Sequence, residues 1–301
     1  MTKPITAASP PSPLARVLVT GVGGPSGKAA TVALKARGFQ VLGVDMNAVP
    51  NEADQFAQVP AALDAAYPDV LRRLIHEHRI GWLFPTVAEE LAIVAELAAG
   101  LRAQGVAVFI SAPAAVRICQ DKWETAQALQ AHGVAVPASA VGDADDPVVR
   151  ALGFPVVSRP RVGRGGRGVV VHDGPGVAAA VSNPIWQEFM DGTEYDVLCV
   201  CHPDAPHTVI MRQVFEKTAL KEGRVGNAIA LKPVDAPDIA RLAEDAARAL
   251  GLTGPLDMDI RRGRDGAPRL LEINARIGAH ALAAPAVFDV LVELVRTGHR
   301  G

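Results

Sequence analysis

The stretch RLLEINARIGAH, residues 269–280, contains the pattern that decides the fold. From Arg269 to Asn274 polar and apolar residues alternate after the start, which predicts a strand with one face toward water. Glu272 and Asn274 are two residues apart, so both side chains leave such a strand on the same side. The preceding segment GPLDMDIRRGRDGAP, residues 254–268, offers a second alternating run followed by a turn.

These two runs are expected to pair as a hairpin, because the Asp-Gly in the turn tolerates the positive φ that a tight hairpin needs. Three polar side chains of the first run share one face: Asp257, Asp259 and Arg261. Pairing brings Asp259 close to Glu272 and Asn274, whose oxygen atoms suit a Mg²⁺ ion that also holds substrate phosphates. The alternative is an amphipathic surface hairpin whose acids only face solvent, and the hairpin alone leaves both interpretations open.

Composition bounds the class of protein. The chain has 301 residues, of which 49% are hydrophobic and 21% charged, which is enough for about two domains with substantial cores. A net charge of −2 gives no global reason to expect nucleic acid or an anionic membrane as a partner. The three cysteines have no metal-binding spacing, and no apolar run approaches the roughly 18 residues of a membrane span, so we expect a cytoplasmic protein.

An α/β pattern runs from residue 15 to residue 111, after a proline-containing segment, residues 1–14, that we expect to be a flexible tail. The segment 16–47 is expected to form a strand, a Gly-rich turn, a helix and a second strand that ends at Asp45. Helices and strands then alternate as far as VAVFIS, residues 106–111, which predicts a parallel sheet covered by helices. Ligands of such sheets sit at the carboxyl ends of the strands, where the candidates are Thr20, Thr86, Glu89 and Glu90.

A cationic loop is the second informative feature. RPRVGRGGRG, residues 159–168, lies between two predicted strands, 154–158 and 169–172. Its arginines and glycines can fold backbone N–H groups and guanidinium groups over a polyphosphate. An RGG-like nucleic-acid segment is the alternative, but a single short copy without interleaved aromatic residues favours a flap over nucleotide phosphates.

Taken in order, these segments resemble the ATP-grasp superfamily, and most of all its carbamoyl-phosphate-synthase-type branch. The resemblance extends from residue 16 to about residue 295 and rests on six segments: VLVTGVGGPSG…VLGVDMN, FPTVAEEL, DKWETAQALQAHGVAVP, FPVVSRPRVGRGGRG, QEFMDGTEYDV and LDMDIRRGRDGAPRLLEINAR. It implies a mixed α/β and α+β fold. A Rossmann-like preATP-grasp domain, residues 15–111, precedes a two-lobed ATP-grasp domain with lobes at 112–187 and 188–301.

The resemblance also implies roles for individual residues. The nucleotide-binding residues are Lys122, Arg159, Arg164, Gly165, Gly166, Gly168, Glu188, Phe189, Met190 and Glu194. In this set, Lys122 and Arg159 contact the α- and β-phosphates, the loop 163–168 closes over the β- and γ-phosphates, the segment 188–190 lies against adenine, and Glu194 binds the ribose.

The implied metal ligands are Asp259, Glu272 and Asn274, for Mg²⁺ or alternatively Mn²⁺. The implied catalytic residues are Arg276, Arg159 and Lys122, with Arg276 steadying the transferred phosphoryl group or an acyl phosphate. Two departures from the superfamily pattern stand out. Arg159 replaces the more common lysine, as in the carbamoyl-phosphate-synthase branch, and Ala275 replaces the proline that usually follows the metal ligands.

The chemistry that the resemblance implies is ATP-dependent ligation of a small-molecule carboxylate to an amine. The carboxylate attacks the γ-phosphorus of ATP, and the amine then displaces phosphate from the acyl phosphate. The candidate contacts for the acceptor carboxylate, besides Arg276, are Arg212, Lys217, Lys221 and Arg224. Enzymes of this kind are commonly homodimers. The alternatives are a non-catalytic ATP-binding regulatory protein of the same fold, and an NAD(P)-dependent oxidoreductase that uses residues 21–27 and Asp45.

Overall fold

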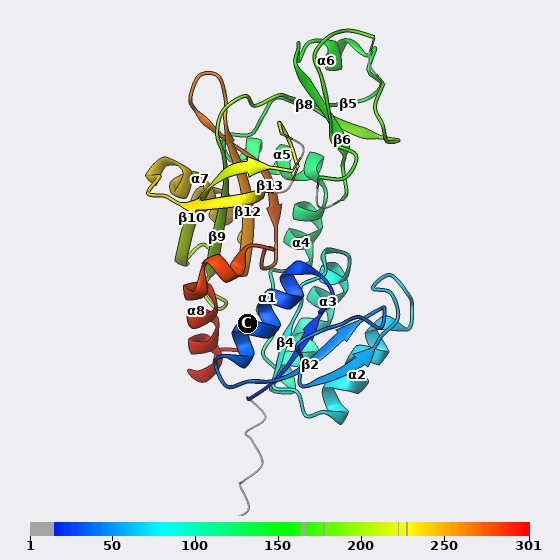
Figure 1. Ribbon diagram of the computed structural model, residues 1–301, viewed down its shortest axis with the longest axis vertical. Coiled ribbons are helices and arrows are strands. Elements are labelled where there is room, and N and C mark those ends of the chain that lie inside the picture. Colours follow the sequence, from blue (N-terminus) through cyan, green and yellow to red (C-terminus); the bar gives the residue numbers. More distant parts are fainter. Residues whose placement is uncertain (1–14, 164–165, 177, 222, 227) are drawn as a thin grey trace, which may run out of the picture.

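The computed structural model describes residues 15–163, 166–176, 178–221, 223–226 and 228–301. The predicted tail, residues 1–14, and two predicted nucleotide-binding residues, Arg164 and Gly165, lie outside the described residues. Three sheets follow one another along the long axis of the molecule (Figure 1). None of the described helices combines the length and the apolar character that a membrane span requires.

The first sheet is parallel, as the alternating pattern predicts. It has the order β3-β2-β1-β4 and consists of β1 (Arg16–Thr20), β2 (Gln40–Asp45), β3 (Gln55–Gln58) and β4 (Trp82–Phe84). Leu18 packs in one hydrophobic cluster with helices α2 (Tyr67–Glu77) and α3 (Leu91–Ala103). Its neighbour Val17 packs in a second cluster with α1 (Pro25–Lys35). The sheet is therefore covered on both faces, which the nearly continuous apolar sequence of β1 requires.

The strand expected at residues 106–111 does not form. Ala107 makes a single bridge to Trp82 and the segment then leaves the sheet. The Val108 N–H donates to the Arg300 carbonyl at 2.7 Å, and the Arg102 guanidinium donates to the Val108 carbonyl at 2.7 Å. Ala107 pairs with the β4 edge through Gly81 and Leu83, and the Val108 groups on the opposite edge of the segment are bonded to the C-terminus and α3.

A second, smaller sheet follows two helices, α4 (Pro113–Gln120) and α5 (Lys122–Ala131). It is antiparallel, with the order β5-β8-β6-β7, and consists of β5 (Ser139–Val141), β6 (Val156–Pro160), β7 (Val170–His172) and β8 (Pro184–Glu188). Trp186 and a short helix, α6 (Pro147–Arg150), enclose its small core. The cationic loop joins β6 to β7, as expected.

The third sheet is antiparallel, with the order β11-β10-β9-β12-β13. Its strands are β9 (Glu194–Cys201), β10 (Val209–Leu220), β11 (Ala228–Pro233), β12 (Gly254–Arg262) and β13 (Pro268–Asn274). The central strand β9 is buried along its whole length. Helix α7 (Pro237–Ala249) packs on the sheet, and α8 (Pro285–Arg296) lies between the sheet and α1 (Figure 1). Among the described residues, single-turn 3₁₀ helices span Ala88–Glu90 and Ala281–Ala283.

The expected hairpin forms between β12 and β13. Asp259 lies opposite Glu272 and Asp257 lies opposite Asn274, so Asp259 lies near both predicted ligands as expected, while an irregularity between Asp259 and Ile260 shifts the register by one residue. Gly266 in the turn has a φ of 76°, which glycine adopts without strain. We propose domain boundaries after residues 111 and 187, the second of which lies one residue before the end of β8.

Candidate functional site

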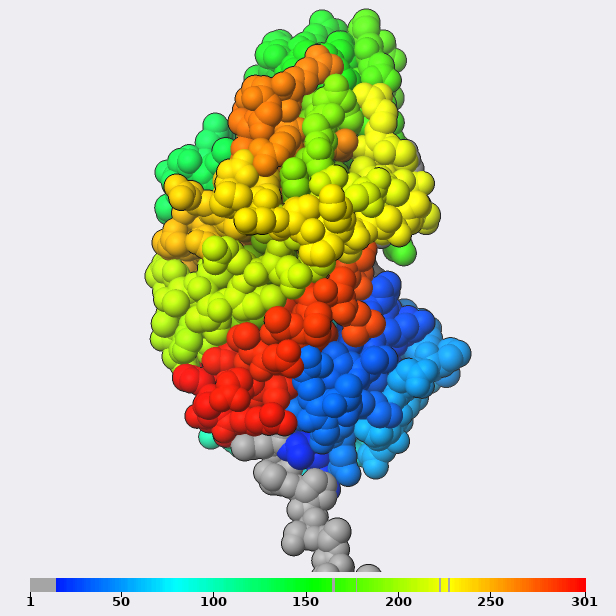
Figure 2. Space-filling view, turned by 60° about the vertical axis from the view of Figure 1, so that its left-hand side comes forward, coloured from blue at the N-terminus to red at the C-terminus, as the bar shows by residue number. Residues whose placement is uncertain are grey.

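One cleft joins the three sheets. It has a volume of about 970 Å³ and is lined by the Gly-rich turn after β1, by β6 and β8, and by β9, β12 and β13. Figure 2 shows the surface hollowed between the yellow hairpin of β10 and β11 and the blue N-terminal part. The carboxyl ends of β1 and β4 therefore face the polar side of the third sheet.

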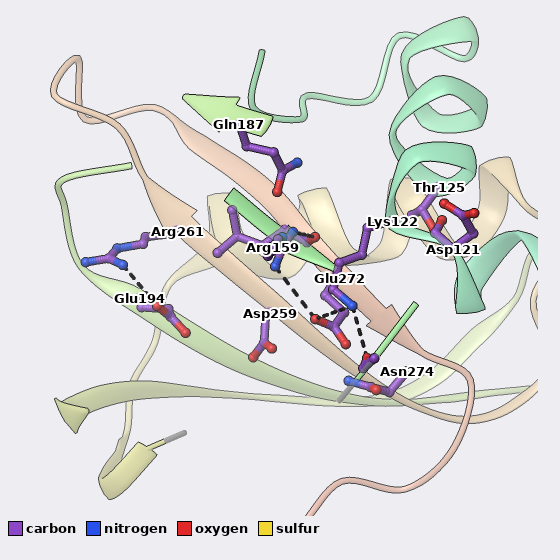
Figure 3. Close-up of polar contacts among 12 residues, drawn as sticks. Asp121, Lys122, Thr125, Arg159, Gln187, Glu194, Asp259, Arg261, Glu272 and Asn274 are labelled. Atoms are coloured by element: carbon purple, nitrogen blue, oxygen red, sulfur yellow. Dashed lines mark hydrogen bonds and ion pairs between the residues drawn. The ribbon is translucent and has the colours of Figure 1, made fainter. Parts of the chain in front are cut away.

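Lys122 reaches this cleft because Asp121 caps helix α5 just before it. The Asp121 carboxylate accepts hydrogen bonds from the N–H groups of Trp123 and Glu124, at 2.9 and 3.3 Å. The Lys122 Nζ lies 3.4 Å from Glu272 Oε2 and donates to the Gly163 carbonyl at 3.1 Å. The cap therefore orients the first residue of α5 toward the β12–β13 hairpin (Figure 3).

Arg159 approaches the same carboxylate from strand β6 (Figure 3). Its Nη1 lies 3.8 Å from Glu272 Oε2, and its Nη2 donates to the Leu271 carbonyl at 2.7 Å. Its Nε is buried and has no hydrogen-bond partner among the described residues. Burial lowers the pKa of both Arg159 and Lys122, while the Glu272 carboxylate opposes this shift. Two cations and a spare buried donor thus meet at one point, an arrangement that suits an anion.

The described part of the cationic loop borders the cleft through Gly163, Gly166 and Arg167. Gly166 has a φ of 68°, and a Cβ at this position would lie 3.0 Å from the Gly226 Cα. The loop therefore packs backbone against backbone on the β10–β11 connection, a contact that requires glycine.

The segment 188–190 forms another wall of the cleft. The Glu188 N–H donates to the Ala138 carbonyl at 2.9 Å, and the Phe189 N–H donates to the Pro155 carbonyl at 3.2 Å. The Phe189 ring lies 4.4 Å from the Arg224 guanidinium and 5.0 Å from that of Arg261. These contacts fix the segment, and they place an aromatic ring and the buried Met190 beside the space that a ligand can fill.

Glu194 lies at the start of β9 within an ion-pair network (Figure 3). Its Oε1 is 2.7 Å from Lys217 Nζ, and its Oε2 is 3.3 Å from Arg261 Nη1. The same Lys217 Nζ lies 2.5 Å from Asp259 Oδ1. Although burial alone would lower it, the pKa of Lys217 is raised because Asp259 and Glu194 stabilise the ammonium. The lysine therefore holds both carboxylates in place.

Three carboxylates gather on the floor of the cleft. Oxygen atoms of Asp196, Asp257 and Asp259 lie within 4.8 Å of one another, an arrangement that can hold a cation. The His280 Nδ1 lies 2.8 Å from Asp196 Oδ2, and this hydrogen bond raises the pKa of the imidazole. Burial, together with the charges of Asp196 and Asp259, raises the pKa of Asp257 well above its usual value.

Asn274 and Arg276 complete the polar lining. The Arg276 guanidinium donates to Asn274 Oδ1 at 3.2 Å and to the Ile277 carbonyl at 2.7 Å. All the residues predicted to bind nucleotide or metal or to act in catalysis that the structure describes, apart from Gly168, line this one cleft: Lys122, Arg159, Gly166, Glu188, Phe189, Met190, Glu194, Asp259, Glu272, Asn274 and Arg276. Of the candidates at the first sheet, Thr20, Thr86 and Glu90 line it and Glu89 does not.

The four candidate contacts for an acceptor carboxylate differ in their positions and in their ion-pair partners. Lys221 lines the cleft, and Lys217 lines it but is committed to its ion pairs. Arg212 Nε lies 2.9 Å from Glu244 of helix α7, and Arg224 Nη1 lies 2.9 Å from Asp173. Of the four, Lys221 is therefore the one that lines the cleft and has no ion pair reported among the described residues.

The Gly-rich turn of the first sheet is stabilised from within. The Asp45 carboxylate accepts hydrogen bonds from the N–H groups of Gly23 at 3.0 Å and Asn47 at 3.1 Å. Asp45 therefore closes the turn, which weakens the dinucleotide interpretation of this residue. Nearby, the buried Glu90 accepts hydrogen bonds from the hydroxyl groups of Thr20 and Tyr67 and from the Thr86 N–H, so the end of β1 is linked to α2 and to the segment after β4.

No functional role was assigned to Asp196 or to Asp257 from the sequence. The signal was present, because Asp196 follows Glu194 by two residues on a strand and therefore shares its face. Asp257 was placed on the correct face but was given no role. His280, which contacts Asp196, lies outside any strand and could not be placed from periodicity.

Comparison with known proteins agrees with this geometry. The ATP-grasp domain family matches residues 119–280, and the family described as PylC-like, N-terminal domain matches residues 17–109. The chain therefore belongs to the ATP-grasp family, whose members are typically ADP-forming ligases that bind ATP with Mg²⁺. The more specific assignment to the carbamoyl-phosphate-synthase branch stays a prediction.

Three solved structures are similar in fold. L-amino acid ligase from Bacillus licheniformis is 18% identical with a TM-score of 0.70, over 89% of this chain and 68% of that chain. N5-carboxyaminoimidazole ribonucleotide synthetase from Thermotoga maritima is 19% identical with a TM-score of 0.62, over 87% and 68%. The biotin carboxylase domain dimer of the Hydrogenobacter thermophilus 2-oxoglutarate carboxylase, solved with MgADP, is 15% identical with a TM-score of 0.64, over 88% and 65%. No curated protein matches the chain.

Proposed function

We propose that this chain is a Mg²⁺- and ATP-dependent ligase that activates a carboxylate as an acyl phosphate and couples it to an amine. ADP and phosphate are the other products. One observation carries the proposal: Lys122 and Arg159, from two different elements, converge on the Glu272 carboxylate at 3.4 and 3.8 Å. Cationic donors beside an acidic oxygen cluster are what a metal–polyphosphate substrate requires.

The cleft fits ATP. Its volume of about 970 Å³ exceeds what one nucleotide needs, and the buried Arg159 Nε offers an unused donor for a phosphate oxygen. In the proposed arrangement Lys122 and Arg159 hold the phosphates and the loop 163–168 covers them. The segment 188–190 lies against adenine, and Glu194 accepts hydrogen bonds from the ribose hydroxyl groups.

Three residues of the cleft offer oxygen atoms as ligands for a hard divalent cation: Asp259, Glu272 and Asn274. Asp259 and Glu272 face each other across the hairpin. We propose these residues as the ligands of Mg²⁺, or of Mn²⁺ in its place. When bound, the metal neutralises phosphate charge and stabilises the charge that develops during phosphoryl transfer.

The residues of this chain mainly position the substrates and stabilise the negative charge of the phosphate groups. Lys122 and Arg159 place positive charge beside the phosphate oxygens, and Arg276, whose guanidinium donates to Asn274 at 3.2 Å, lies where it can contact the transferred group. The carboxylate oxygen attacks the γ-phosphorus, and the bond to the ADP oxygen breaks. The amine, in its uncharged form, then attacks the acyl carbon, and phosphate leaves with the bonding electron pair and takes up the proton that the nitrogen loses. Enclosure between the lobes protects the acyl phosphate from water.

The test is ADP release with Mg·ATP in the presence of single amino acids and small carboxylic acids, each with and without a primary amine. The proposal predicts acid-dependent ADP release that falls by at least about 100-fold in Glu272→Gln. Glu293→Gln, which changes an exposed acid of α8, serves as the matched control. ATP binding with no acid-dependent turnover would instead favour a regulatory ATP-binding protein, and absence of ATP binding would contradict the whole proposal.

A further inference from the structure

Two carboxylates on the floor of the cleft form no direct ion pair with a lysine or arginine of the described residues. Asp196 is 1% exposed and Asp257 is 8% exposed, and both line the cleft. The third member of the cluster, Asp259, is already paired with Lys217 at 2.5 Å. Asp196 and Asp257 therefore depend on charges that are not direct ion-pair partners, those of Lys217 and Arg276, and Asp196 also contacts His280.

Asp196 has one oxygen atom without a donor. Its Oδ2 lies 2.8 Å from His280 Nδ1, but its Oδ1 is buried and has no hydrogen-bond partner among the described residues. Buried carboxylate oxygens are normally satisfied, because leaving one without a donor is costly. An unpartnered oxygen in a ligand cleft therefore indicates that a donor on a ligand completes the site.

The Asp257 carboxylate lies against Gly278, a residue without a side chain. A Cβ on Gly278 would lie 1.5 Å from Asp257 Oδ2, so only a residue without a side chain can stand there unless the carboxylate moves. Gly278 belongs to the segment after β13 that also carries His280. The same segment thus makes room for one carboxylate and contacts the other.

This pair adjoins the proposed metal ligands but does not duplicate them. Asp196 lies opposite Asp259 in the pairing of β9 with β12, and Asp257 lies opposite Asn274 in the pairing of β12 with β13. A ligand group between Asp196 and Asp257 would therefore lie directly beside two of the proposed metal ligands, Asp259 and Asn274.

We infer that Asp196 and Asp257 form the subsite for the cationic amino group of the amine substrate, a primary alkylammonium ion. The inference rests on the proposed ligase function and narrows its second substrate. An ammonium group has three N–H donors, which suit two carboxylates that face one another. His280 acts as a positioning residue, because its hydrogen bond fixes the Asp196 carboxylate.

The experiment separates activation of the acid from use of the amine. Hydroxylamine, largely uncharged at neutral pH, traps an acyl phosphate as a hydroxamate and reports activation alone. Methylamine, ethanolamine, putrescine and the 20 standard L-amino acids are then supplied as amines in its place. Asp196→Asn and Asp257→Asn remove one charge each at constant shape, and Asp235→Asn is the control at an exposed acid.

The expected result is a KM for the primary amine that rises roughly 10- to 100-fold in each cleft variant, as loss of a charged hydrogen bond implies. In the same variants, the rise in the KM for the primary amine should exceed any change in hydroxamate formation by at least about fivefold, because hydroxylamine does not need an ammonium subsite. Unchanged amine dependence with normal hydroxamate formation would overturn this inference alone. No hydroxamate from the wild-type protein would overturn the proposed function, and with it this inference.

Two further measurements keep the test decisive if a variant fails to fold. In the wild-type protein, the inhibition constant of the alcohol that corresponds to the best amine should be at least about tenfold higher than the KM of that amine. Equal values for the alcohol and the amine would contradict an ammonium subsite. Mn²⁺ titration in the presence of ADP, followed by electron paramagnetic resonance, should give the same stoichiometry in wild type and in whichever cleft variant folds. Loss of one bound Mn²⁺ would assign the pair to a metal instead.

Discussion

The Lys217 ammonium lies 2.5 Å from Asp259 Oδ1, and the Lys217 side chain is only 6% exposed. The same nitrogen lies 2.7 Å from Glu194 Oε1, so one cation joins carboxylates from two other strands of the third sheet. The residues proposed for metal and ribose binding are therefore held in place by the protein before either ligand is present.

Lys217→Met should destabilise the fold. The substitution leaves two buried carboxylates without their cation, and breaking a buried ion pair typically costs about 3–5 kcal/mol. Urea denaturation measures the change in the free energy of unfolding, with Lys232→Met on the exposed edge strand as the control, expected within about 0.5 kcal/mol of wild type. Wild-type stability in Lys217→Met would show that Glu194 and Asp259 do not depend on this lysine.

Asp121→Ala should weaken both helix α5 and ATP binding. It removes the cap and the ion pair with Arg161, which has a distance of 2.7 Å, so we expect a loss of about 1–2 kcal/mol in the free energy of unfolding. The KM for ATP should rise as well, because Lys122 is the next residue. Asp121→Asn keeps a capping oxygen and should retain most of the stability. If Asp121→Ala and Asp121→Asn have the same free energy of unfolding and the same KM for ATP, the capping oxygen is not the cause of the loss.

Stability should depend on pH through His280. The hydrogen bond with Asp196 raises the pKa of this imidazole in the folded protein above its ordinary value of about 6.5. The stabilisation is therefore fully present below pH of about 6.5 and is lost as the pH rises through the folded-state pKa. In denaturation curves, the difference in stability between wild type and His280→Gln should be larger at low pH and shrink toward high pH. His76→Gln, at an exposed histidine, should show no such trend.

The sequence was sufficient for the hairpin because its evidence is local. Alternation places Asp259 and Glu272 on the polar faces of their strands, and the Asp-Gly turn sets the pairing nearest to it. Continued from the turn, this register would set Asp259 opposite Leu271, and the irregularity between Asp259 and Ile260 that brings it opposite Glu272 is not specified by the pattern. The parallel first sheet was predictable for the same reason, from strands and helices that alternate with clear boundaries.

Long-range contacts were not predictable from such local patterns. The pairing of Lys217 with two carboxylates depends on how β10 lies beside β9, which no periodicity specifies. The fate of residues 106–111 depends on the carbonyl of Arg300, almost 200 residues further along the chain. Arg212 and Arg224 were equal candidates with Lys221 in the sequence, and only their partners Glu244 and Asp173 separate them.

The central claim is that this cleft phosphorylates a carboxylate, and hydroxamate formation tests it most directly. The protein is incubated with Mg·ATP, hydroxylamine and single carboxylic acids, and hydroxamate is quantified against ADP. The account predicts, for at least one acid, equal amounts of hydroxamate and ADP in wild type and neither product in Glu272→Gln. ADP formation that does not depend on the acid, without hydroxamate, would contradict it.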